Sequence, residues 1–251
     1  MIRSVALVYN IPDLPSNFTL VLSRSAIANI FAGNITVWND TTLQTLNPGV
    51  VLPAQPIVLP AQPIVLVVRK DSSGTSQIMT SALSSFSPAW ASTYGVFTDP
   101  DNWPVFAYKG ETSTGVSGIV SSIPNSFGYL DQDRAVQDGL PYAAIINKAG
   151  NAVLPSVSSV QAAVLDHQDS FTNLTRFTAT IADGSGAGEY PLVAFSYYIV
   201  HQNLQNNCTL KAEMLRYFYW LLNDPVNKSS PHSNPIVPVL NSVSILISFS
   251  L

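Results

Sequence analysis

The feature that most constrains the fold is an alternation of short apolar, β-branched runs with segments whose apolar residues recur at helical spacing. Strands are expected at 64–69, 127–130, 143–146 and 192–200. Helices are expected after Ser23 and at 75–86, 114–123, 158–167 and 209–222. Strands and helices that alternate in this way predict an α/β fold, with a mostly parallel or mixed sheet packed on both faces.

Length and charge narrow the possible functions. The chain has 251 residues, enough for one large domain or two small ones. Only 10% of its residues are charged and its formal net charge is −4. The negative net charge argues against binding to nucleic acid, which requires a basic surface. The low fraction of charged residues argues against a coiled coil and against charge-rich disorder. No apolar run at either end is long enough for a membrane span.

Cysteine and histidine usage argues against metal and redox chemistry. The single cysteine, Cys208, permits no intrachain disulfide and no thiolate cluster. The histidines, His167, His201 and His232, have no ligand-like spacing, so no metal and no cofactor are expected.

The sequence contains no G-x-S-x-G elbow and no histidine in a triad context, and we expect no enzyme. The glycine-rich run at 184–188 follows no clear strand, which indicates a mobile loop and not a nucleotide-binding motif.

The most informative segment runs from a predicted strand, through small residues, into a predicted helix near Thr75. A helix that begins there leaves the backbone N–H groups of Ser73, Gly74 and Thr75 without helical partners, at the positive end of the helix dipole. Such a helix start can bind an anion. The same residues also fit a simple turn with a helix N-cap, and both interpretations remain open at this point.

Two charged residues strengthen the anion interpretation. Arg69, at the end of the predicted strand, can present its planar guanidinium to two oxygens of a tetrahedral oxyanion. Asp71 is close enough in sequence to hold that side chain in place. A Walker A motif is excluded, because no Gly-Lys-Ser/Thr follows the glycine.

The same residues resemble a known family. Residues 69–76 read R-K-D-S-S-G-T-S, which resembles the R-x-D-G-S-G-T-S signature of periplasmic phosphate-binding proteins, the solute receptors of phosphate ABC transporters. Ser72 departs from the signature, because the family usually has glycine there; a negative φ would let the turn accept a side chain. Other segments match the family pattern in the same order along nearly the whole chain: 30–40, 46–49, Trp90 with Gly95, 115–120, 123–130, 190–192 and 218–220.

The resemblance implies a periplasmic-binding-protein fold of type II, with one complete α/β lobe and part of a second lobe. Proteins of this family close two lobes over dehydrated phosphate and perform no catalysis. The family's roles would make Arg69 the guanidinium clamp and Asp71 the carboxylate that orients it. Ser73, Gly74 and Thr75 would be the hydroxyl and amide donors to phosphate.

The resemblance also implies a division of the chain. Residues 1–12 would form the hinge entry from a first lobe that is missing, residues 13–190 the second lobe with the anion site, and residues 191–251 the hinge return with the C-terminal part of the first lobe. Half of the family's phosphate ligands would then be absent, so we expect millimolar or undetectable phosphate affinity. The alternative is a degenerate extracellular interaction or sensor module that keeps the fold after losing its ligand.

Location and partners follow from the resemblance alone. It implies an extracytoplasmic protein (periplasmic, secreted or cell-surface), although no signal peptide is recognised in the chain. It implies inorganic phosphate as the ligand, a membrane permease or receptor as partner, and a monomer. Six sequons, which a chain rich in Asn, Ser and Thr also produces by chance, could carry glycans: Asn17, Asn34, Asn39, Asn173, Asn207 and Asn227.

One tandem repeat stands out. Residues 51–57, V-L-P-A-Q-P-I, recur without change at 58–64. A single extra copy is too short for a solenoid, so we expect one copy to lead into the strand at 64–69 and the other to add surface length. A genuine duplication and an artefact of gene prediction both fit this pattern.

Overall fold

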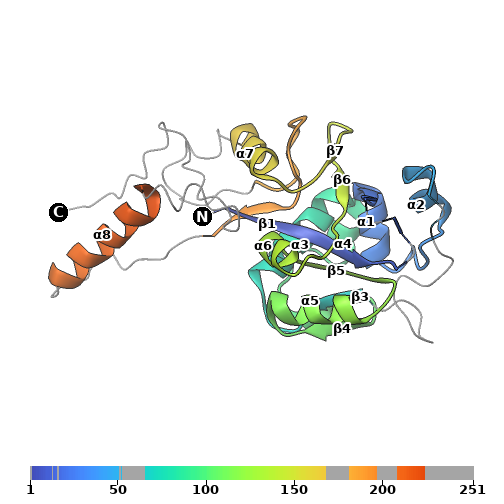
Figure 1. Cartoon of the computed structure of the whole chain (residues 1–251), viewed down its shortest axis with the longest axis horizontal. Helices are drawn as coiled ribbons and strands as arrows, with labels where there is room; N and C mark the ends of the chain where they lie inside the picture. The colour runs from blue at the N-terminus through green and yellow to red at the C-terminus, as the bar shows by residue number, and fades with distance from the viewer. Residues whose placement is uncertain are drawn as a thin grey trace.

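The chain is built around two β-sheets, seen in a computed structural model that describes residues 2–12, 14–15, 17–50, 52, 66–167, 181–196 and 208–223. The strands are β1 (Ile2–Asn10), β2 (Val21–Ser23), β3 (Leu66–Arg69), β4 (Ala107–Gly110), β5 (Ser126–Asp131), β6 (Ala144–Ile146), β7 (Ala152–Val153) and β8 (Val193–Phe195). One sheet has the order β4-β3-β5-β1-β8 and the other the order β2-β6-β7 (Figure 1).

Helices connect and cover these strands. They are α1 (Arg24–Phe31), α2 (Thr41–Leu46), α3 (Gly74–Phe86), α4 (Pro88–Thr93), α5 (Thr112–Ser122), α6 (Gln132–Gln137), α7 (Val157–Asp166) and α8 (Cys208–Asn223), with a short 3-10 helix at Pro100–Asn102. The expected strands correspond to β3, β5, β6 and β8, and the expected helices to α1, α3, α5, α7 and α8. Strand β4 has no signature in the sequence, because its residues, Ala-Tyr-Lys-Gly, form no apolar run. The repeat at 51–64 lies outside the described residues, apart from Leu52.

The larger sheet is mixed, as predicted. Strand β3 runs parallel to β4 and to β5, whereas β1 is antiparallel to β5 and to β8. Alternate residues of a strand point to opposite faces of its sheet. Ala6 and Val8 of β1 therefore pack with buried residues of α5 and α6. Val5 and Leu7 pack on the other face, with residues of α1 and α3. The prediction that helices cover both faces is confirmed.

Helix α1 begins and ends where the sequence predicts. The side chain of Ser23 accepts a hydrogen bond from the N–H of Ala26, which satisfies one of the unpaired donors of the first turn. Gly33 follows the helix with φ of 81°, in the left-handed region that glycine adopts at little cost. A local cap and a local stop therefore define this helix.

Helix α8 departs from the pattern of the other helices. Its apolar residues recur at helical spacing, and an aromatic cluster of this kind is expected to pack into a core. Tyr219 is nevertheless 71% exposed, and Tyr217 and Trp220 are also exposed. Figure 1 shows α8 apart from both sheets. An amphipathic stripe predicts a helix, but it does not supply the surface that would cover the stripe. Among the described residues, no helix combines the length and apolarity that a membrane crossing requires.

Asn47, within the expected L-N-P segment, joins α2 to β2. Its side-chain oxygen accepts from the N–H of Val21 at 2.8 Å, and its side-chain nitrogen donates to the carbonyls of Val21 and Leu43, each at 2.9 Å. The residue is buried, so water cannot replace these bonds. Asn47 thus gives Val21 a pair of hydrogen bonds like those of a neighbouring strand.

We predict that Asn47→Ala lowers the free energy of unfolding by about 1–3 kcal/mol, because it leaves the half-buried N–H of Val21 without its acceptor. Urea unfolding followed by circular dichroism measures this change. The control is Asn102→Ala at an exposed position, where a change within about 0.5 kcal/mol is expected. Equal stabilities of the two variants would contradict the proposed role of Asn47.

Candidate anion-binding site

The guanidinium of Arg69 lies at the carboxyl end of β3 and faces the start of α3. The residue is only 8% exposed. Its Nε and Nη2 donate to the two carboxylate oxygens of Asp71, at 2.9 and 2.5 Å. Its Nη1 donates to the hydroxyl of Thr75 at 3.1 Å and to that of Ser113 at 3.3 Å. The structure therefore places Arg69, Asp71 and Thr75 in one hydrogen-bonded group.

The first turn of α3 leaves backbone donors at the surface beside this group. Ser73 is the N-cap, and its hydroxyl oxygen accepts from the N–H of Thr75 at 3.1 Å. Gly74 is the first helical residue and is exposed. A Cβ at Gly74 would meet no protein atom within 4 Å, so packing does not require glycine here. The exposed backbone of Gly74 is therefore accessible to an approaching anion.

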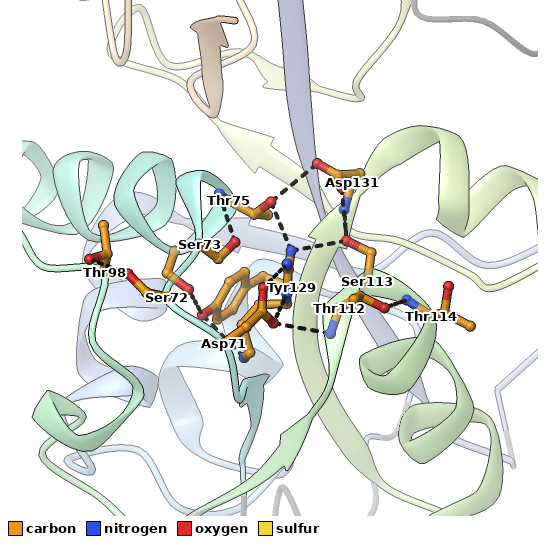
Figure 2. Close-up of polar contacts among 12 residues, drawn as sticks. Asp71, Ser72, Ser73, Thr75, Thr98, Thr112, Ser113, Thr114, Tyr129 and Asp131 are labelled. Carbon is orange, nitrogen blue, oxygen red and sulfur yellow. Dashed lines mark hydrogen bonds and ion pairs between the residues drawn. The ribbon is translucent and has the colours of Figure 1, made fainter.

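Ser72 tolerates the departure from the family signature. Among the described residues other than glycine, only Thr112, Asn125 and Asp183 have positive φ, so Ser72 keeps a negative φ. Its hydroxyl donates to that of Thr98 at 2.9 Å (Figure 2). A side chain at this position therefore needs no strained backbone.

Three residues near Arg69 were not anticipated from the sequence. Ser113 lies in the first turn of α5, and Asp131 ends β5. The carboxylate of Asp131 accepts from the hydroxyl of Thr75 at 3.2 Å and from that of Ser113 at 2.8 Å (Figure 2). Arg3 lies 3.7 Å from the same carboxylate. The charges of this group therefore balance, with two guanidinium groups and two carboxylates.

Sheet topology explains why these residues meet. Strands β3, β4 and β5 are parallel, so their carboxyl ends reach the same edge of the sheet. Arg69, Asp131 and the start of α5 follow from those ends, where ligands bind in open α/β sheets. Ser113 and Asp131 could be found only from the pairing of the strands, because no local sequence motif indicates this pairing.

The start of α5 is tied to the same group through Asp71. The N–H of Thr112 donates to the Asp71 carboxylate at 3.0 Å, and Thr112 has φ of 58°. Gly110, the last residue of β4, lets α5 pack closely on the end of that strand, because a Cβ there would lie 2.3 Å from the backbone nitrogen of Val116. Asp71 therefore holds the Arg69 side chain and the backbone of a neighbouring helix start together.

Tyr129 connects the site to the aromatic core. Its hydroxyl lies 2.6 Å from that of Ser76 and accepts a long bond of 3.4 Å from the N–H of Arg69. Burial raises the pKa of Tyr129 to about 12, so the phenol stays neutral. Its ring packs against those of Phe31 and Trp103. The end of β3 is thereby fixed to the core beneath it.

Three of the six sequons can be placed. Asn17, Asn34 and Asn39 are exposed. Asn173, Asn207 and Asn227 lie outside the described residues.

Comparisons with known proteins agree with this fold. A family model described as "PBP superfamily domain" matches residues 1–225. The phosphate-binding protein PstS of Methanocaldococcus jannaschii is 34% identical over 213 residues, which cover 81% of this chain and 52% of that protein. The solved structure of a high affinity periplasmic phosphate-binding protein (PfluDING) bound with phosphate has a TM-score of 0.60 at 20% identity, covering 87% of this chain and 60% of that one. The predicted periplasmic-binding-protein fold is confirmed.

A relative of another kind also matches. A proposed serine/threonine-protein kinase/receptor, R826, of Acanthamoeba polyphaga mimivirus is 28% identical over 227 residues, which cover 87% of this chain and 13% of that protein. The chain spans about half the length of the PstS proteins it matches, 52% and 58% of the first two.

We predict that Asp71 stabilises the fold in a pH-dependent way. The hydrogen bond from Arg69 lowers the pKa of Asp71 to about 2, below its ordinary value of 3.8. This contribution is present above about pH 4 and is lost as the pH falls through 2. At pH 6, Asp71→Asn should lower the free energy of unfolding by about 1–2 kcal/mol, a figure discounted for solvent screening.

Urea unfolding of both proteins from pH 6 down to pH 2 measures this difference, which should shrink toward the acidic end. Asp101→Asn, at an exposed carboxylate paired with Lys109, is the control and should change stability by less than about 0.5 kcal/mol. A difference between Asp71→Asn and the parent that does not vary with pH would rule out the Asp71–Arg69 pair as its cause.

Proposed function

Because this chain belongs to the PBP superfamily, we propose that it binds inorganic phosphate in front of the first turn of α3 and performs no catalysis. The observation that carries the proposal is the buried guanidinium of Arg69, which is held by Asp71 and lies beside a helix start whose first residue, Gly74, is exposed. The names of the PstS relatives and of the phosphate-bound neighbour support phosphate as the anion.

The groups that could donate hydrogen bonds to phosphate differ in the hydrogen bonds they make when no phosphate is bound. The N–H of Gly74 belongs to the first turn and has no helical carbonyl to bond. The hydroxyl of Ser73 accepts from the N–H of Thr75 and keeps its own hydrogen to donate. The hydroxyl of Thr75 already donates to Asp131, so it must exchange one acceptor for another. Phosphate binding is therefore partly an exchange of hydrogen bonds.

Asp131 and the placement of the donors limit the affinity. The Asp131 carboxylate, a negative charge beside the incoming anion, competes for the Thr75 hydroxyl. The donors among the described residues approach from one side, so water still competes for each of them. We therefore propose that this chain binds phosphate in the millimolar range or more weakly.

Domain organisation and location complete the proposal. Residues 1–12 would form the hinge entry, 13–190 the lobe with the site, and 191–251 the return to the first lobe; β1 nevertheless pairs directly with β5 inside the sheet of that lobe. We also propose an extracytoplasmic, monomeric protein that meets a membrane permease or receptor; of these properties, only the periplasmic location appears in the name of a similar structure. Glycans at Asn17, Asn34 and Asn39 would be sterically possible, because these residues are exposed.

A second candidate is a sensor or interaction module without its own ligand. The observation in its favour is the match to the mimivirus kinase/receptor protein, of which the similar region forms only 13%. A domain of that kind would keep the fold and present its surface to another part of a receptor. The retained group of Arg69, Asp71, Ser73 and Thr75 favours phosphate binding over this alternative.

We predict that phosphate shifts the backbone amide resonances of Gly74 and Thr75 in a 1H–15N NMR titration of the 251-residue chain. Arg69→Ala should weaken this binding by about 10- to 100-fold, since hydrogen bonds to charged groups contribute about 1.5–3 kcal/mol. NMR suits the experiment because it detects binding in the millimolar range.

Lys70→Gln is the matched control. Lys70 is adjacent in sequence, exposed and paired with Glu111, so its loss tests the general effect of one positive charge. It should change affinity by about twofold at most. If the two variants weaken phosphate binding equally, the binding arises from nonspecific electrostatic attraction and not from this site. Micromolar affinity would contradict the half-site proposal, and the absence of any phosphate-induced shift would favour the sensor module.

A further inference from the structure

Three side chains of metal-ligand type gather at the carboxyl end of α7. Asp166 is the last residue of that helix, His167 is its C-cap, and Glu189 comes from the loop before β8. One ligating atom from each residue lies within 4.8 Å of the others. The spacing of the histidines predicts no metal site, but the fold brings a carboxylate from 22 positions along the chain beside an Asp-His pair.

Glu189 supplies the observation that points to a missing ligand. The residue is 1% exposed. Its Oε1 accepts from the N–H of Gly184, whereas its Oε2 is buried and has no hydrogen-bond partner among the described residues. A buried carboxylate oxygen without a partner is costly. A bound cation would satisfy it.

The neighbouring carboxylate increases that cost. Asp166 accepts from the N–H of Ser185 at 2.7 Å through Oδ2. Two carboxylates in one place favour either a shared proton or a cation between them.

One nitrogen of the His167 imidazole is tied to the backbone of α7. Its Nδ1 lies 2.9 Å from the carbonyl oxygen of Ala163. A hydrogen bond donated from Nδ1 to this carbonyl places the proton there and leaves the lone pair on Nε2. Metal-binding histidines are commonly held by a bond of this kind.

The glycine-rich loop at 184–188 is shaped around the cluster. A Cβ at Gly184 would lie 2.2 Å from Oε2 of Glu189, 2.3 Å from Cε1 of His167 and 2.5 Å from Oδ2 of Asp166. Only glycine therefore lets the loop cover these three groups. The side-chain nitrogen of Asn147 lies 3.0–3.2 Å from the loop carbonyls of Gly186, Ala187 and Glu189. These hydrogen bonds hold the loop at the cluster, whereas the sequence indicated a mobile loop.

We propose that Asp166, His167 and Glu189 bind one divalent first-row transition metal ion, with Zn²⁺ as the favoured occupant. Two carboxylate oxygens and one imidazole nitrogen suit Zn²⁺, whereas Mg²⁺ and Ca²⁺ prefer oxygen ligands alone. Bonds of about 2.0–2.2 Å separate the ligands of one zinc ion by about 3–4 Å, so small side-chain rotations would close the site. The ligands come from the end of α7 and from the loop before β8, and Arg69 and α3 take no part.

Calorimetric titration of the 251-residue chain with ZnCl₂ tests the proposal. We expect binding of one Zn²⁺ at this site, with a rise in the melting temperature that Mg²⁺ does not produce. Co²⁺ in place of Zn²⁺ should give the visible absorption of a site with nitrogen and oxygen ligands. Glu189→Gln and His167→Gln should each weaken Zn²⁺ binding at least tenfold.

Loss of Zn²⁺ binding in Glu189→Gln cannot be attributed to misfolding. Glutamine has the same shape, can still accept from the N–H of Gly184, and removes a buried charge, so this variant should fold. The control is His201→Gln, a histidine outside the described residues, which should bind Zn²⁺ as the parent does. No Zn²⁺ binding by the parent, or unchanged binding in both ligand variants, would overturn the proposal and leave a carboxyl–carboxylate pair that shares a proton.

Discussion

The structure around the candidate site depends on the burial of one guanidinium. A charged group this deeply buried is tolerated only when its hydrogen bonds are satisfied. Arg69 meets that condition through both oxygens of Asp71 and through the hydroxyls of Thr75 and Ser113. These partners come from the turn after β3 and the first turns of α3 and α5, so satisfying one side chain fixes two helix starts. The positions of the backbone donors in front of Gly74 are consequences of that requirement.

The site also depends on the aromatic core beneath it. Tyr129 packs against Phe31 and Trp103 and places its hydroxyl beside Ser76. Trp38, fully buried, donates from its indole nitrogen to the carbonyl of Asn125, at the start of β5. Several residues of the family-like segments therefore act in packing and not in binding. Their similarity to the family predicts the fold, whereas the candidate anion site depends on the few residues after β3.

The sequence predicted those parts of the fold and of the site that depend on neighbours along the chain. The N-cap at Ser23, the stop at Gly33 and the proximity of Arg69 to Asp71 all involve residues a few positions apart. Ser113 and Asp131 could not be predicted in this way, because they reach Arg69 and Thr75 through parallel strand pairing. The exposure of α8 was missed for a related reason, since a helical pattern does not identify the surface against which it packs.

The two polar clusters differ in how their charges are balanced, and this difference bears on what each can bind. Around Arg69, two guanidinium groups and two carboxylates already compensate one another, so an incoming anion must displace existing hydrogen bonds and gains little net attraction. Around Glu189, two carboxylates face each other beside a histidine and one buried oxygen has no partner, so a cation removes a cost that the protein alone leaves in place. A cluster whose charges already compensate one another binds a ligand weakly and releases it easily. A cluster with an uncompensated buried charge is stabilised by the ligand that compensates it. The proposed anion site and the proposed cation site therefore differ in how far each buried charge is compensated before a ligand arrives.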